Sequence, residues 1–249
     1  MGVAIDWAPL AQVAARLAPT VLARAQTIWG YRVQTEFRSI QVMARFLQEV
    51  LAAGDPLEVF AGASDAVIDE VRHTALCVGV VEALGATALF PTPLAEDESP
   101  SFLALPIPQR ALGTALSMLA ISETLSVALI EDLQKRATQA TIRAVLTATL
   151  ADEDAHRDFG WAYVAASLAR FDADGRDFAR AVAETTLAPH RAGIADALGP
   201  LPMRQRTLDA WPEPELAALG LLGPEREALV KQDALERVLL PRLRSLGIA

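Results

Sequence analysis

Apolar residues recur at helical spacing along most of the chain, and prolines and glycines fall between these stretches. Trp29, Val33, Ile40 and Met43 illustrate the pattern, because residues three, four and seven positions apart share one face of a helix. The spacing predicts long helices over residues 20–53, 64–85, 109–137, 139–170, 176–198 and 224–245. No pair of alternating segments with a hairpin turn stands out, so we expect an all-α fold.

The breaks between the predicted helices suggest how they connect. Gly54-Asp55-Pro56 forms a short turn, and Ser64 and Gly85 are candidate cap residues of the second helix. Residues 86–108 contain five prolines and cannot continue a helix. Two helical hairpins joined by one long crossover form a ferritin-like four-helix bundle. We therefore predict an N-terminal segment (1–19), a ferritin-like bundle (20–170) and a C-terminal helical extension that packs on it (171–249).

Composition and charge narrow the class of protein. The chain has 249 residues, 52% of them hydrophobic, and a mean hydropathy of +0.27. The most apolar stretch, residues 111–130, carries Glu123 at its centre, so we expect a core helix and not a membrane span. A net charge of −9 disfavours nucleic acid and membrane surfaces as partners. A single cysteine and an N-terminus without a secretory pattern favour the cytoplasm.

Two of the three histidines stand in the same local motif. "DEVRH" ends at His73 and "DEDAH" ends at His156, so each histidine follows a glutamate by three positions and an aspartate by four. In a helix, residues three apart lie on one face, so Glu70 and Glu153 each share a face with the histidine that follows. One such pair alone is more often a salt-bridged surface turn. Two pairs in apolar helices indicate a metal site.

Two further glutamates complete the candidate site. Glu36 and Glu123 sit among apolar residues in the first and third predicted helices, where an isolated charge is costly. The residue midway between Glu36 and Glu70 is Ala53, at the Gly54 turn. The residue midway between Glu123 and Glu153 is Thr138, which lies in a sequence without glycine or proline. If both midpoints are turns, each hairpin brings its two glutamates to the same level.

The donor types favour a pair of hard metal ions. Four carboxylates balance two divalent cations, and one imidazole for each ion leaves positions free for water or dioxygen. Such donors suit iron or manganese better than zinc or copper. We expect two iron ions, with a manganese–iron pair as the alternative. The predicted metal ligands are Glu36, Glu70, His73, Glu123, Glu153 and His156.

This set resembles the ferritin-like di-iron carboxylate superfamily, and "DEVRH" is similar to the Asp-Glu-x-Arg-His element of bacterial multicomponent monooxygenases. The resemblance covers residues 20–170 and extends to p-aminobenzoate N-oxygenase-type enzymes. It implies that Asp69 bonds His156 and that Asp152 bonds His73, each aspartate orienting the histidine of the other helix. Cys77 stands where ribonucleotide reductase subunits carry a radical tyrosine, so radical storage is not expected.

The resemblance implies an oxidoreductase that uses dioxygen and an electron donor of unknown identity. The expected reaction is hydroxylation, N-oxygenation or desaturation of a small, moderately hydrophobic substrate, and a homodimer is compatible with the sequence. An apolar lining from Phe37, Met43, Leu119 and Val127 is expected. A ferroxidase or iron store and a structural metal site are the alternatives. Candidate pocket residues are Met43, Thr149, Cys77, Gly160 and Tyr163, and for the last three burial or packing in the core is the other interpretation.

Overall fold

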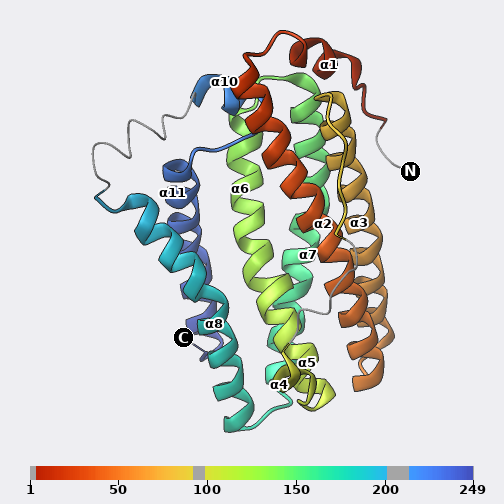
Figure 1. Cartoon of the computed structure of the whole chain (residues 1–249). Helices are drawn as coiled ribbons and strands as arrows, with labels where there is room; N and C mark the ends of the chain where they lie inside the picture. The colour runs from red at the N-terminus through yellow and green to blue at the C-terminus, as the bar shows by residue number, and fades with distance from the viewer. Residues whose placement is uncertain (1–3, 92–98, 201–212, 249) are drawn as a thin grey trace.

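The computed structural model describes residues 4–91, 99–200 and 213–248, and these residues form helices without any strand (Figure 1). The all-α prediction is therefore confirmed for the described part of the chain. The helices are α1 (Ala8–Ala14), α2 (Pro19–Ala53), α3 (Leu57–Ala83), α4 (Pro100–Leu103), α5 (Ile107–Thr114), η1 (Ala115–Ser122), α6 (Glu123–Arg136), α7 (Ala140–Leu168), α8 (Ala173–Leu198), α10 (Glu213–Ala218), α11 (Pro224–Ala234), η2 (Leu235–Leu239) and α12 (Leu240–Ser245).

Helices α2 and α3 form a hairpin that turns at Gly54. This glycine has a φ of 72°, in the left-handed region that ends many helices, as expected for the midpoint turn. The prediction that Ser64 begins the second helix is wrong, because α3 begins at Leu57. The hydroxyl of Ser64 donates to the carbonyl of Phe60 at 2.8 Å, as a serine inside a helix commonly does. Gly85, with a φ of 78°, follows the C-cap as predicted.

The third long helix is continuous but not uniform. Its middle segment, η1, is a π-helix that lies between α5 and α6 and ends immediately before Glu123. In η1 the hydroxyl of Ser122 donates to the carbonyl of Ser117, five residues earlier, at 2.8 Å. Such wide turns are rare and occur most often at functional sites. The periodicity predicted the helix but not the π segment.

The turn between α6 and α7 falls where the geometric argument requires it, without glycine or proline. Ala137 adopts an extended conformation with ψ at 121°, which ends α6. The side chain of Gln139 then accepts a hydrogen bond from the amide of Ile142 at 2.7 Å and caps α7. The midpoint expected at Thr138 therefore lies between the two helices.

The long helices run side by side, with α11 next to α6, and α8 next to α11 and η1 (Figure 1). Two apolar clusters fill the interior, and the polar cluster described below lies between them. On α2, Trp29 and Val33 belong to one apolar cluster, and Met43 and Phe46 belong to the other. Glu36 lies on the stretch of α2 between these residues. The core is thus interrupted by one polar layer.

One continuous helix in the described part of the chain, Ile107–Arg136, is long and apolar enough to cross a membrane by length and composition alone. Its most apolar 18-residue window is 61% buried inside the protein. Core helices of bundles have the same properties. Three short helices of the described residues lie in segments for which no helix was predicted: α1 in the N-terminal segment, α4 in the connection before α5, and α10 before α11.

Candidate metal centre

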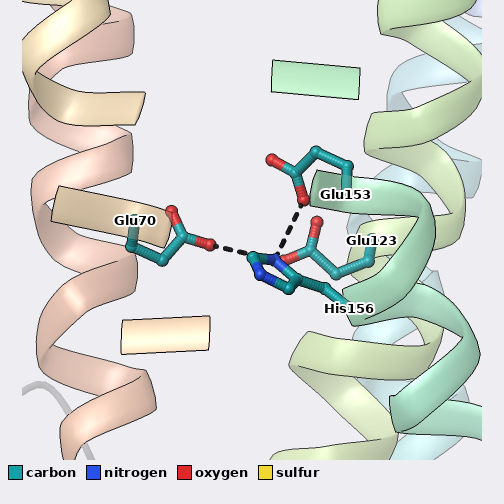
Figure 2. Close-up of side chains that lie close together, drawn as sticks. All are labelled: Glu70, Glu123, Glu153 and His156. Atoms are coloured by element: carbon teal, nitrogen blue, oxygen red, sulfur yellow. Dashed lines mark ion pairs between the residues drawn. The ribbon is translucent and has the colours of Figure 1, made fainter. Parts of the chain in front are cut away.

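The structure brings the six predicted ligands together in the interior. Glu70 and His73 extend from α3, Glu153 and His156 from α7, Glu123 from the start of α6, and Glu36 from α2. Figure 2 shows the carboxylate of Glu70 facing His156 across the space between α3 and the other two helices. Five of the six residues are at most 4% exposed, and the side chain of Glu36 is 19% exposed.

One half of the cluster surrounds the imidazole of His73. Its Nδ1 atom lies 3.4 Å from Oε1 of Glu153. The same nitrogen lies 3.8 Å from Oε2 of Glu36 and 3.8 Å from Oε2 of Glu70. The ligand atoms of Glu36, His73 and Glu153 all lie within 4.8 Å of one another, a spacing suited to one metal ion.

The other half of the cluster surrounds the imidazole of His156. Its Nδ1 atom lies 3.4 Å from Oε2 of Glu153 and 3.7 Å from Oε1 of Glu70. Together with Glu123, these residues place four ligand atoms within 4.8 Å of one another (Figure 2). Glu70 and Glu153 therefore direct one oxygen to each half, whereas Glu36 and Glu123 each belong to one half. This arrangement describes two adjacent sites with two shared carboxylates.

Each imidazole is oriented by an aspartate of the opposite helix. Nε2 of His73 lies 3.1 Å from Oδ2 of Asp152, and Nε2 of His156 lies 3.1 Å from Oδ2 of Asp69. A carboxylate only accepts hydrogen bonds, so Nε2 of each histidine carries a proton and Nδ1 faces the cluster, where it can bind a metal ion once it has lost its own proton. Nη2 of Arg72 lies 2.6 Å from both aspartates and joins the two pairs.

The electrostatics of the cluster show an excess of negative groups. Burial and neighbouring carboxylates raise the pKa values of Glu36 and Glu123 well above the usual range. Burial lowers the pKa of His73, but Glu153 and other acidic neighbours outweigh it and raise the pKa to about 11. Burial raises the pKa of Glu153, but the neighbouring imidazoles of His156 and His73 outweigh this effect and hold the pKa below its usual value. The cluster therefore retains protons unless another cation balances its charge.

The residues fit a pair of metal ions on geometric grounds as well. Four buried atoms of the cluster have no hydrogen-bond partner among the described residues, namely Oε2 of Glu70, Nδ1 of His73, Oε2 of Glu153 and Nδ1 of His156. Buried polar atoms are normally satisfied, so a group of four that face one another is unusual. All four are metal-ligand atoms. A divalent cation in each half would satisfy them.

A pocket of about 470 Å³ reaches the cluster at Glu36. Cys77 and Thr149, two of the predicted pocket residues, line it, together with apolar residues of α2, α6 and α7. Leu222 and Pro224, from the C-terminal extension, form part of its wall. The extension thus contributes to a cavity beside the candidate metal centre. None of the residues expected to form the apolar lining lines this pocket. Its aliphatic wall consists instead of Ile28, Leu129, Ile130, Leu133, Val145 and Leu146.

Three predicted pocket residues do not line this pocket. Met43 lies inside an apolar cluster. Gly160 packs so closely on η1 that an added Cβ would lie 2.5 Å from the backbone of Leu119. Tyr163 donates a hydrogen bond to Asp55 at 2.7 Å, at the α2–α3 turn. Core packing, the other interpretation of Gly160 and Tyr163, describes those two residues, and Met43 likewise packs in the core.

Sequence reasoning gave no role to two residues that the structure places at the site. Arg72 bridges the two aspartates, and its position three residues after Asp69 was a signal for that contact. Arg32 lines the pocket one helical turn before Glu36. Its spacing from Glu36 placed both on one face, but the pocket itself depends on the packing of α11 and could not be read from the sequence.

Comparisons with protein-family models, with curated proteins and with solved structures found no match for this chain.

Proposed function

We propose that the protein is a non-haem di-iron oxidoreductase that activates dioxygen to oxidise a small, moderately hydrophobic organic molecule. The observation that carries this proposal is the pair of adjacent ligand sets with two shared carboxylates, next to an apolar pocket. We further propose a ferritin-like four-helix bundle, in which the α2–α3 hairpin and the hairpin of α5, η1, α6 and α7 are joined by one long crossover.

The donor set assigns each residue to one ion or to both. Glu36 and His73 would hold the first ion, Glu123 and His156 the second, and Glu70 and Glu153 both. When bound, two iron ions supply the electrons and the Lewis acidity that the reduction of dioxygen requires. Oxygen-rich ligation with one imidazole for each ion favours iron, and a manganese–iron pair fits the same donors.

The protein's own groups position the ligands and control access. Asp152 and Asp69 accept the Nε2 protons of the histidines, which keeps both Nδ1 lone pairs directed into the cluster. The apolar clusters above and below exclude water from this polar layer. The pocket approaches from one side only, at Glu36, so an organic substrate would reach the half that contains His73.

The test compares metal content and oxygen consumption in the purified full-length chain. We expect about two irons per chain after anaerobic loading with Fe(II), and oxygen uptake when a chemical reductant is present. Glu36→Ala and His156→Ala are expected to abolish this uptake and to lower the metal content, while the helical circular dichroism is retained. Glu131→Ala is the matched control, because Glu131 lies on α6 with Glu123 but its side chain is 46% exposed.

Unchanged metal content in both ligand variants would refute the assignment. Accumulation of hundreds of irons per assembly would identify an iron store instead, which is the alternative that the same ligand set allows. Bound metal without any oxygen uptake would leave a structural site. The pocket at Glu36 favours substrate oxidation over these two functions, since neither function needs an apolar cavity beside the ions.

A further inference from the structure

The pocket beside Glu36 contains one cation, Arg32 of α2. Arg32 and Glu36 are one helical turn apart, roughly 6 Å along the axis. The guanidinium carbon lies 4.3 Å from the ring centroid of Trp29, and the indole is held in turn by a hydrogen bond of 3.0 Å to the carbonyl of Leu219. No hydrogen bond or ion pair joins the Arg32 guanidinium to any described residue. The charge is thus positioned but not paired.

The other charged groups of the pocket do not neutralise this arginine. Among the described residues that line the pocket, Glu36 and Glu227 are the only acidic ones. Glu227 pairs with Lys231 one turn further along α11, and Glu36 is assigned to the metal. Burial lowers the pKa of the Arg32 guanidinium, and nearby groups that include Glu36 and Glu227 offset this effect only in part. A ligand anion would supply the missing partner.

The walls of the pocket indicate the rest of the ligand. They consist mainly of aliphatic side chains, from α2, α6 and α7, and the volume of about 470 Å³ lies in the range of small-molecule sites. Its aromatic residues offer little surface for ring stacking, because Arg32 covers Trp29 and Tyr31 is 66% exposed. A flexible aliphatic body fits such walls. The planar fork of a guanidinium matches a carboxylate through two parallel hydrogen bonds.

We propose that this pocket binds an aliphatic monocarboxylate, with Arg32 holding the carboxylate and the aliphatic side chains of α6 and α7 enclosing the chain. The proposal rests on the proposed function, since it names the substrate class of the same site. It also predicts a binding selectivity that can be measured without turnover. The carboxylate determines the orientation of the ligand, and the apolar walls contribute the remaining affinity.

The experiment uses three probes with the same body and different head groups: octanoate, 1-octanol and octylamine. Binding to the purified full-length protein is measured by calorimetry and by the fluorescence of its tryptophans, of which Trp29 lines the pocket. Octanoate is expected to bind more tightly than the other two. Arg32→Gln should weaken octanoate binding by roughly 10- to 100-fold, the range for a hydrogen bond to a charged group, and leave octanol unaffected.

Arg38→Gln is the matched control, since Arg38 is an exposed arginine of the same helix outside the pocket. It should bind octanoate as the unmodified chain does, and Arg32→Lys should be intermediate because lysine keeps the charge but loses the fork. Equal octanoate affinity in Arg32→Gln, or tighter binding of octanol or octylamine than of octanoate, would overturn the proposal.

Two further measurements separate this proposal from the proposed function. Arg32→Gln should keep its metal content, because no hydrogen bond or ion pair joins the Arg32 guanidinium to a described ligand residue. His156→Ala should lose metal but still bind octanoate, because His156 does not line the pocket. A chain that binds octanoate in the Arg32-dependent way but never takes up metal would refute the metal function alone. A chain that takes up metal but ignores octanoate would refute the ligand class alone.

Discussion

The close contact between α7 and η1 at Gly160 leads to a prediction that can be worked out from the structure. A Cβ added at Gly160 would lie 2.5 Å from the carbonyl carbon and Cβ of Leu119. The nearest atoms belong to the backbone or lie directly on it, so no flexible side-chain end can move aside. Gly160→Ala therefore has to separate α7 from η1, next to Glu123. Gly30 of α2 is the matched control, because a Cβ there meets no atom within 4 Å.

The two substitutions share the gain in helix propensity and differ in the cost of overpacking. Alanine in place of a helical glycine gains about 1 kcal/mol from propensity at both positions. Overpacking at Gly160 costs about 3 kcal/mol, the upper part of the usual range, because backbone has to move. The expected net changes are a loss of about 2 kcal/mol for Gly160→Ala and a gain of about 1 kcal/mol for Gly30→Ala.

Thermal unfolding of the metal-free chain provides the measurement, since bound metal would add its own stabilisation. For a chain of this size about 1 kcal/mol shifts Tm by roughly 2–4 °C, so Tm should fall by about 4–8 °C in Gly160→Ala. It should rise by about 2–4 °C in Gly30→Ala. A Tm for Gly160→Ala at or above that of the unmodified chain would show that α7 and η1 can separate without cost, and would refute the packing argument.

Three other predictions concern contacts outside the ligand set. Arg72→Gln removes the bridge between the aspartates and should weaken metal binding by about 10- to 100-fold in a chelator competition, whereas unchanged affinity would show that the bridge is dispensable. Tyr163→Phe removes one of the two donors to Asp55, the other being Arg170, and should lower the free energy of unfolding by about 1 kcal/mol in urea. Burial and the charge of Lys231 lower the pKa of His190 in the folded chain, so the unfolded chain binds a proton more readily. Stability should therefore decline as pH falls below about 6.5, and His190→Gln should flatten that decline in denaturation curves measured across this range.

The sequence allowed most helices and the six cluster residues to be named, because both depend on local spacing. A glutamate and a histidine three residues apart share a helix face whatever the rest of the chain does. The turn at Thr138 was located because it lies midway between Glu123 and Glu153, although no helix-breaking residue is present there. The role of the six residues as metal ligands stays a prediction.

Features that depend on packing could not be obtained in this way. The π segment before Glu123 has no breaker residue, and it packs against α7 and α8, contacts that local spacing does not reveal. The start of α3 at Leu57 was missed because Ser64 has the composition of a cap but bonds within the helix. The pocket was misplaced because its wall includes Leu222 and Pro224, whose position depends on how the C-terminal helices fold back.

The crossed pairing of Asp69 with His156 and of Asp152 with His73 has a mechanical consequence for α3 and α7. Sliding one helix past the other by a single residue means a translation of about 1.5 Å and a rotation of about 100°. That movement would break both pairings at once, together with the contacts of Arg72. Apolar side chains alone tolerate such slippage far better, because their contacts are not directional. The polar layer therefore sets the register of the two helices, and insertions in this chain should be tolerated at the hairpin ends and not within that layer.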